Sequence, residues 1–191
     1  MINAQELRKG HVVSHEGVLY KVISADYHTG GGKIGGLVHA KMRNLGTGHL
    51  TEHRFTSHDK LEDMDVNRQT MDFLYLTADE CCFMNPESFE QVSLPKAGLG
   101  PIVPYLKEGM KVQMEFLEGR PISVDFPPCA EVTVTATAAG IKGDTDSTYK
   151  TAVIDNGMEV LVPQFIKTGD TIKIEIESQK YLERVQKERK A

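Results

Sequence analysis

Apolar and polar residues alternate regularly along much of this chain, and this alternation limits the folds that are open to it. In the segment 131–138, "EVTVTATA", and again in 170–178, "DTIKIEIES", every second side chain is apolar. A period of two places the apolar set on one face of a β-strand and the polar set on the other. Turn signals separate such segments at Glu16-Gly17, Glu118-Gly119 and Asn156-Gly157, and the last of these is the strongest hairpin signal. The sequence therefore predicts an all-β fold.

The predicted strands group into three segments of similar length. Residues 1–63 contain a hairpin and a glycine loop and follow the pattern of a small SH3-type barrel. Residues 64–128 and 129–191 each suggest five strands, as in an OB barrel, a fold often used to bind oligonucleotides. Pro127-Pro128 marks the second boundary, because neither residue can donate to a ladder. A short helix is predicted after Asn85, a good N-cap that is followed by proline. We therefore expect three consecutive small β-barrels.

Charge is distributed unevenly along the chain. The whole sequence carries −5, but residues 1–60 hold eight Lys/Arg against five Asp/Glu, which gives +3. Residues 61–128 hold five against twelve, which gives −7, and residues 129–191 hold nine against ten, which gives −1. All seven histidines lie within the first 60 residues. A basic, titratable N-terminal part beside an acidic middle indicates a polyanionic partner at one end of the molecule.

The cysteines and the apolar runs argue against a secreted or membrane protein. Cys81 and Cys82 are adjacent and cannot both pair with Cys129, which suits a reducing compartment. The apolar runs are far too short to cross a bilayer, and the segment "MINAQELRKGHVV" lacks the apolar core of a secretory signal. We therefore expect a cytoplasmic protein.

The segment 29–36, "TGGGKIGG", contains one lysine and five glycines and lies between two predicted strands. After this loop, apolar residues alternate with His39, Lys41 and Arg43. In a strand, that period places the three basic or titratable side chains together on the outer face. The sequence therefore predicts a small RNA-binding surface formed by these three residues.

The chain resembles the bacterial elongation factor P family along essentially its whole length. The resemblance rests on the lysine-bearing glycine loop followed by "KMRNLGTG", on "FLYLTADECCFMNPESFEQ" and on "EGMKVQMEFLEGRPISVDFP". It also rests on "GIKGDTDSTYKTAVIDNGMEVLVPQFIKTGDTIKIEI", with "YLER" shortly after it. This resemblance implies one SH3/KOW-like domain and two OB domains in an L-shaped, tRNA-like outline.

The resemblance also implies a function in translation. The expected molecule is a monomer that is not an enzyme, has no catalytic residues and needs no cofactor or metal. Its partners would be the 70S ribosome, peptidyl-tRNA and ribosomal RNA. It would bind between the peptidyl-tRNA and exit-tRNA sites and rescue ribosomes stalled on consecutive prolines.

The resemblance assigns the glycine loop to peptidyl-tRNA. Lys33 would be the tip residue beside the CCA end, and Gly31, Gly32, Ile34 and Gly35 would form the loop around it. Glycine lets a backbone pass between RNA surfaces, and a single ammonium meets phosphate or 2′-hydroxyl groups without reading sequence. The expected effect is orientation of the tRNA, not supply of a base.

This loop departs from the Pro-Gly-Lys-Gly that is common in the family, because Ile34 follows the lysine and Leu37 stands where an aromatic residue is common. The departure leaves open whether a modifying enzyme acts on Lys33. A β-lysyl group, an aminopentanol group or a bare lysine all occur in the family. It also leaves open a specialised paralogue with altered targets.

The resemblance reaches two further places in the last third of the chain. Gly143, Asp144 and Thr145 correspond to a loop near the exit-site codon. Tyr181 and Arg184 match a pair that is associated with small-subunit and tRNA contacts.

Two other classes of function are less consistent with the residues. A generic single-stranded RNA-binding protein needs aromatic platforms interleaved with basic residues, whereas the predicted OB segments are acidic or neutral and hold no tryptophan. A metal- or cysteine-dependent enzyme needs clustered ligands, or a nucleophile beside a base. The pairs His11/His15 and His49/His53 have helical metal-binding spacing but lie in predicted strands, and no histidine follows His58. We therefore predict no metal site.

Overall fold

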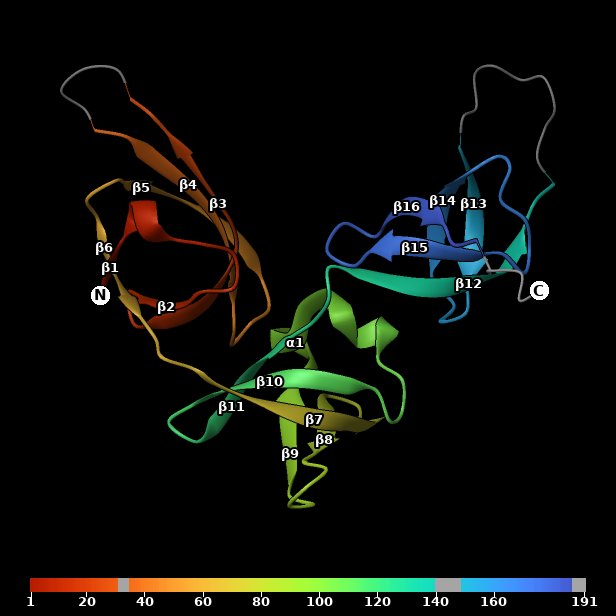
Figure 1. The fold of residues 1–191 in the computed structure, drawn as a ribbon, viewed down its shortest axis with the longest axis horizontal. Coiled ribbons are helices and arrows are strands. Elements are labelled where there is room, and N and C mark those ends of the chain that lie inside the picture. The colour runs from red at the N-terminus through yellow and green to blue at the C-terminus, as the bar shows by residue number, and fades with distance from the viewer. Residues whose placement is uncertain (31–34, 140–148, 187–191) are drawn as a thin grey trace. The chain divides into compact units, whose positions relative to one another are not determined.

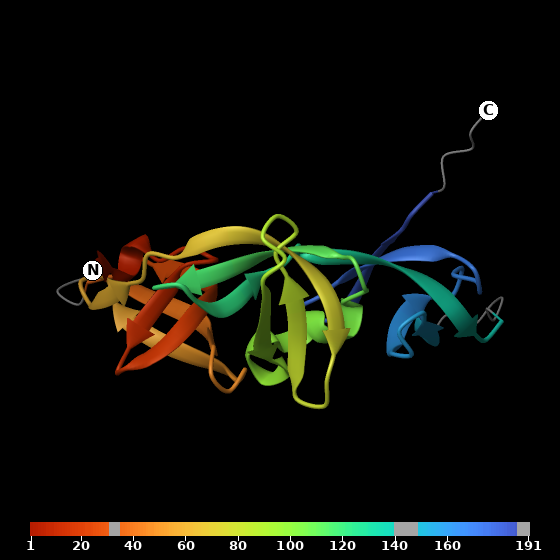
Figure 2. The same ribbon diagram turned by 90° about the horizontal axis from the view of Figure 1, so that it is seen from below.

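The computed structural model describes residues 1–30, 35–139 and 149–186, and antiparallel strands in three sheets dominate these residues (Figures 1 and 2). The all-β prediction is confirmed. Contacts divide the chain into two compact units, residues 1–126 and 127–191. The first unit holds two of the sheets and the second unit holds the third.

The N-terminal sheet has the strand order β1-β6-β2-β3-β4-β5. Its elements are β1 (Ile2–Asn3), η1 (Ala4–Glu6), β2 (Val12–His15), β3 (Val18–His28), β4 (Leu37–Asn44), β5 (Leu50–Thr56) and β6 (Lys60–Asp63). Glu16 and Gly17 both have positive φ, 52° and 77°, as a tight two-residue hairpin turn requires. The hairpin predicted at this dipeptide is therefore confirmed.

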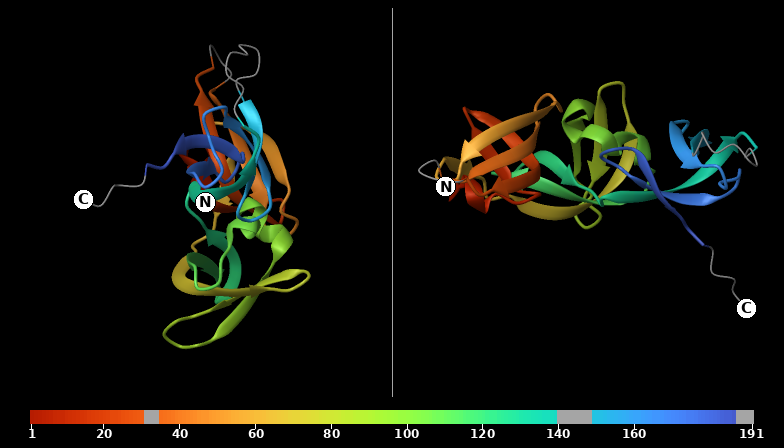
Figure 3. Two further views of the ribbon diagram at one scale, coloured as in Figure 1. Left: turned by 90° about the vertical axis from the view of Figure 1, so that its right-hand side faces the viewer. Right: turned by 90° about the horizontal axis from the view of Figure 1, so that it is seen from above.

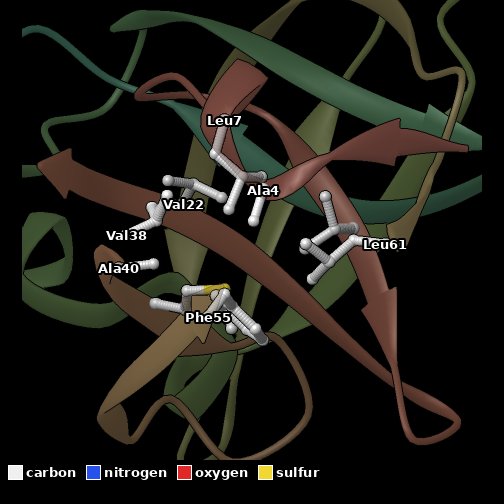
Figure 4. Close-up of a cluster of buried hydrophobic side chains, with 9 residues drawn as sticks. Ala4, Leu7, Val22, Val38, Ala40, Phe55 and Leu61 are labelled. Atoms are coloured by element: carbon white, nitrogen blue, oxygen red, sulfur yellow. The ribbon is translucent and has the colours of Figure 1, made fainter. Parts of the chain in front are cut away.

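The core of this sheet consists of the side chains that alternation turns inward. Figure 4 shows Leu7 from the segment after η1 together with Val22, Val38 and Phe55 from three different strands. All four side chains are buried. Burying such side chains is worth about 1.5–3 kcal/mol each, so the alternation that turns them inward contributes directly to the stability of this sheet.

The central sheet has the strand order β11-β10-β7-β8-β9. Its elements are β7 (Asn67–Leu76), β8 (Glu80–Met84), β9 (Gln91–Pro95), α1 (Lys96–Leu99), η2 (Gly100–Tyr105), β10 (Lys111–Leu117) and β11 (Arg120–Asp125). The edge strands β9 and β11 contact each other, so the sheet curls toward a closed barrel. Glu118 and Gly119 have φ of 50° and 79°, which confirms the second predicted turn.

The short helix predicted after Asn85 is wrong, because the chain makes a single turn there and then enters β9. Asn85 does act as an N-cap would, since its Oδ1 accepts the N–H groups of Glu87 at 2.8 Å and Ser88 at 3.2 Å. The N–H of Phe89 then donates to the Asn85 carbonyl at 2.8 Å, and Phe89 has a φ of 60°. A left-handed residue at this position ends the helical path after one turn.

The C-terminal sheet has the strand order β14-β13-β12-β15-β16. Its elements are β12 (Cys129–Thr137), β13 (Tyr149–Ile154), β14 (Glu159–Pro163), β15 (Thr171–Glu175) and β16 (Lys180–Arg184). The hairpin at Asn156-Gly157 is confirmed, since Ile154 N–H donates to the Met158 carbonyl at 3.0 Å across it. Its core includes Ile172 and Ile174, which are fully buried.

Two glycines let the N-terminal sheet approach the central one within the first unit. A Cβ added at Gly48 would overlap the Ala97 carbonyl of α1, and a Cβ added at Gly98 would overlap the Leu45 carbonyl. Any other residue at these positions would force the two backbones apart. The segments "NLGTG" and "KAGLG" therefore form one close contact.

A buried ion network also joins the two sheets of the first unit. Glu115 on β10 is fully buried, and its Oε2 lies 2.8 Å from Nζ of Lys21 on β3. Its Oε1 lies 3.1 Å from Nη2 of Arg68 on β7. Lys21 Nζ also lies 3.4 Å from Asp125 Oδ1 and donates to the Val124 carbonyl at 3.4 Å. A buried carboxylate needs such partners, so the network ties β3 to β10 and β7.

Candidate nucleic-acid interface

The β3–β4 hairpin carries the glycine loop. Lys33, with Gly31, Gly32 and Ile34, lies outside the described residues. The ladder between the two strands continues to the pair His28 and Leu37, so the pairing reaches the base of the loop.

The base of this loop is held by close packing and by a hydrogen bond. The Gly36 carbonyl accepts the N–H of Ser57 at 2.8 Å. The Tyr27 ring lies so close to Gly36 that a Cβ there would overlap it, and a Cβ on Gly35 would lie 3.2 Å from Ser57 Oγ. Any larger residue at position 36 would displace the Tyr27 ring, which is 49% exposed. Tyr27 was missed by the sequence reasoning, although an aromatic residue next to a glycine loop is a usable signal.

His39 and Lys41 lie on the outer face of β4, as alternation predicted. His39 is half-buried and Lys41 is exposed. The strand register places His39 between Asp26 of β3 and Arg54 of β5, and it places Lys41 beside Glu52. These side chains line a pocket of about 230 Å³.

The outer face therefore carries mixed charge instead of the uniformly basic charge that the sequence suggested. Lys41 and Arg54 are balanced by Asp26 and Glu52 when the histidines are neutral. The rings of His28 and His39 meet edge to face, with their centroids 4.9 Å apart. Contact of this face with RNA remains a prediction.

Arg43 does not belong to this exposed surface, and that part of the prediction is wrong. Its side chain is buried, with 7% of the residue exposed. Its Nη1 donates to the Gly48 carbonyl at 3.2 Å, and its guanidinium lies against Gly100 at the start of η2. Its cross-strand neighbour is Lys21, which is buried in the ion network. Gly100 of η2 lies against this end of β4. Alternation therefore predicted the correct face of the strand for Arg43 but wrongly predicted that the side chain would be exposed.

A second group of histidines, His15 and His53, lies against Phe55 of the N-terminal core. The His53 ring stacks on Phe55 and meets the His15 ring edge to face at 5.3 Å. Its Nε2 lies 3.0 Å from Thr51 Oγ1. Burial, helped by the nearby charge of His15, lowers the pKa of His53 below its ordinary 6.5. Within residues 1–30, 35–139 and 149–186, no group of three or more His, Cys, Asp or Glu is arranged to hold a metal ion.

In the second unit, Gly143, Asp144 and Thr145 lie outside the described residues. Tyr181 is half-buried, and burial raises the pKa of its hydroxyl. Arg184 is exposed, with Nη1 3.9 Å from Asp170 Oδ2 and its guanidinium 5.6 Å from the centre of the Phe165 ring. The structure thus places the two predicted contact residues on the same strand, β16.

Comparison with known proteins identifies the family. The family model described as "Elongation factor P (EF-P) KOW-like domain" matches residues 3–61, "Elongation factor P (EF-P) OB domain" matches 66–124, and "Elongation factor P, C-terminal" matches 130–184. Elongation factor P from Erythrobacter litoralis is 37% identical over 182 residues, which cover 95% of this chain and 97% of that protein. The chain belongs to the elongation factor P family. Elongation factor P from Symbiobacterium thermophilum is 38% identical over 185 residues, which cover 96% of this chain and all of that protein.

Membership of the elongation factor P family makes this chain a translation elongation factor. The predicted order of a KOW-like domain followed by OB-type domains is confirmed. Among solved structures, "Eukaryotic translation initiation factor 5A from Methanococcus jannaschii" is 17% identical with a TM-score of 0.46, over 65% of this chain and 90% of that chain. None of the helices within the described residues has the length and apolar character needed to cross a bilayer.

Proposed function

We propose that this elongation factor binds the 70S ribosome between the peptidyl-tRNA and exit-tRNA sites. There it stimulates peptide-bond formation on stalled sequences such as consecutive prolines by positioning the peptidyl-tRNA. The observation that carries this proposal is the 37% identity to elongation factor P over 95% of the chain. That similarity includes the β3–β4 hairpin, whose loop bears Lys33 as its only lysine.

The hairpin supports a mechanism based on orientation. The ladder is paired as far as His28 and Leu37, and Tyr27 and Ser57 hold Gly36 in place. A fixed base reduces the conformational entropy that the two strand ends would lose on binding between RNA surfaces. The Lys33 ammonium would then restrain the peptidyl-tRNA near its reactive geometry through phosphate or 2′-hydroxyl contacts. No acid–base or nucleophilic step by the protein is needed, so the factor is proposed to act without enzymatic activity and without a cofactor.

The three segments 1–63, 64–128 and 129–191 are proposed as the domains of this factor. The loop at Gly143-Asp144-Thr145 is assigned to the exit-site codon. Exposed Lys41 and half-buried His39 are assigned to RNA contacts beside the loop.

In the second unit, Tyr181 and Arg184 are assigned to small-subunit or tRNA contacts. The factor is proposed to act as a cytoplasmic monomer. A modifying enzyme that acts on Lys33 is an open part of the proposal, and the intact mass of the native protein tests it directly.

Competition with deacylated tRNA tests the proposed site. Ribosomes that carry peptidyl-tRNA and have a vacant exit site should bind the fluorescently labelled factor. Filling the exit site beforehand with deacylated tRNA should prevent that binding, because both ligands would occupy the same space. Equal affinity for vacant and filled ribosomes would place the factor elsewhere.

A further inference from the structure

Phe89 is exposed at the loop between β8 and β9, although its side chain is large and apolar. This residue is 71% exposed, more than any other aromatic residue among the large exposed apolar residues of the described chain. Its φ of 60° lies in the left-handed region, which is unusual for a bulky residue and which glycine or asparagine adopts at lower cost. The turn accounts for the left-handed backbone but not for an aromatic side chain that is exposed there, and we ask what that ring could contact.

The loop holds Phe89 in one place. Its N–H donates to the Asn85 carbonyl at 2.8 Å, and the Asn85 N–H donates to the Glu90 carbonyl at 2.9 Å. The Asn85 side chain fixes the intervening residues through the N–H groups of Glu87 and Ser88. The loop joins β8 to β9 in the yellow-green part of the ribbon (Figure 3). A fixed backbone at Phe89 reduces the conformational entropy that the loop loses when it binds a partner.

The neighbours of Phe89 along the chain are acidic. Glu87 and Glu90 flank it and are exposed, and the segment 85–91, "NPESFEQ", contains no lysine or arginine. Residues 61–128 as a whole carry −7. RNA phosphates would be repelled by this charge, whereas a basic protein surface would be attracted.

We propose that Phe89, with Glu87 and Glu90 beside it, docks on a basic protein surface that offers an apolar pocket for the ring. The inference rests on the proposed function, since the ribosome supplies that surface. It assigns protein recognition to the central barrel, separately from the RNA contacts assigned to the N-terminal loop.

Ribosome binding by single variants tests the role of the ring. Phe89→Ala should bind ribosomes at least about tenfold more weakly, as expected for removal of an aromatic anchor. Phe89→Gly should weaken binding equally without lowering the melting temperature, because glycine relieves the left-handed strain. Tyr75→Ala is the matched control, since Tyr75 is a 52% exposed aromatic residue of the same sheet, and it should bind like the parent. Parent-like binding by both Phe89 variants would overturn the proposal.

Replacing Glu87 and Glu90 distinguishes a protein partner from an RNA partner, because the change in binding affinity should have opposite signs in the two cases. Glu87→Gln combined with Glu90→Gln should weaken binding to a basic protein but tighten binding to RNA. With Phe89 replaced by photoreactive benzoylphenylalanine in the full chain, irradiation on ribosomes should yield an adduct with a ribosomal protein. Tighter binding by the double variant, or an adduct with ribosomal RNA alone, would overturn the proposal. Failure of the parent chain to bind ribosomes would instead refute the proposed function itself.

Discussion

Replacing Glu115 by Gln should destabilise the first unit strongly. The substitution keeps the shape of the side chain but removes the charge that Lys21 Nζ meets at 2.8 Å. Lys21 is 8% exposed and Glu115 is fully buried, so water cannot replace the lost partner. Removing one member of a buried ion pair typically costs about 3–5 kcal/mol, and the partly exposed Asp125 at 3.4 Å recovers only part of this. At about 4 °C per kcal/mol, the value between those of smaller and larger domains, the melting temperature should fall by roughly 10–20 °C.

The double variant Lys21→Met with Glu115→Met is the control for this prediction. Removing both charges and keeping the volume should restore stability to within about 1–2 kcal/mol of the parent, because no buried charge is left unpaired. Thermal melts followed by circular dichroism measure both effects. A loss below about 1 kcal/mol for Glu115→Gln, as for an exposed pair, would show that burial does not strengthen the dependence of Lys21 on Glu115. A loss in the double variant equal to the sum of the losses in Lys21→Met and Glu115→Met alone would also contradict the prediction.

Lys41→Gln should reduce the slope of log K against log salt for ribosome binding by about 0.7–0.9. Arg43→Gln should mainly lower the melting temperature, because Arg43 is buried. An unchanged slope for Lys41→Gln would remove it from the RNA contacts. Asp144→Ala should reduce polyproline synthesis while moving the melting temperature by no more than a few degrees; a large loss of stability with normal ribosome affinity would indicate a purely structural turn. Burial and then the charge of His15 lower the pKa of His53, so protonation favours the unfolded state. The contribution of His53 to stability is therefore complete above about pH 6.5 and declines as the pH falls through its lower folded pKa, and His53→Gln should flatten that decline in thermal melts.

Local patterns were sufficient to predict most of the fold. Alternation identified the strands, and the dipeptides Glu16-Gly17, Glu118-Gly119 and Asn156-Gly157 identified three hairpins, because both signals depend only on neighbouring residues. Asn85 shows where this reasoning stops. The same capping hydrogen bonds begin a helix or a single turn, and the left-handed Phe89 decides between them.

The environment of side chains depended on residues far along the chain. Arg43 was assigned to the correct face, but α1 and η2, some fifty residues later, cover it. Lys21 and Glu115 are 94 positions apart, and no local pattern pairs them. A glutamate between apolar residues in "VQMEFL" was the available signal, since an unpaired charge is rarely buried in a strand. Lys33 was recognised only through the family pattern, because its proposed role depends on a partner that the chain does not contain.

The rate of proline-containing tripeptide formation on programmed ribosomes reports directly on the proposed role of Lys33. The parent factor, Lys33→Ala and the control Lys60→Ala should be compared at saturating concentrations of the factor. Thermal melts should first confirm that the three proteins have the same melting temperature. Lys60 is an exposed lysine of β6 in the same sheet. The account predicts that the parent and Lys60→Ala stimulate the reaction and that Lys33→Ala loses most of the stimulation. Equal rates for all three proteins would contradict the assignment of Lys33 to the peptidyl-tRNA.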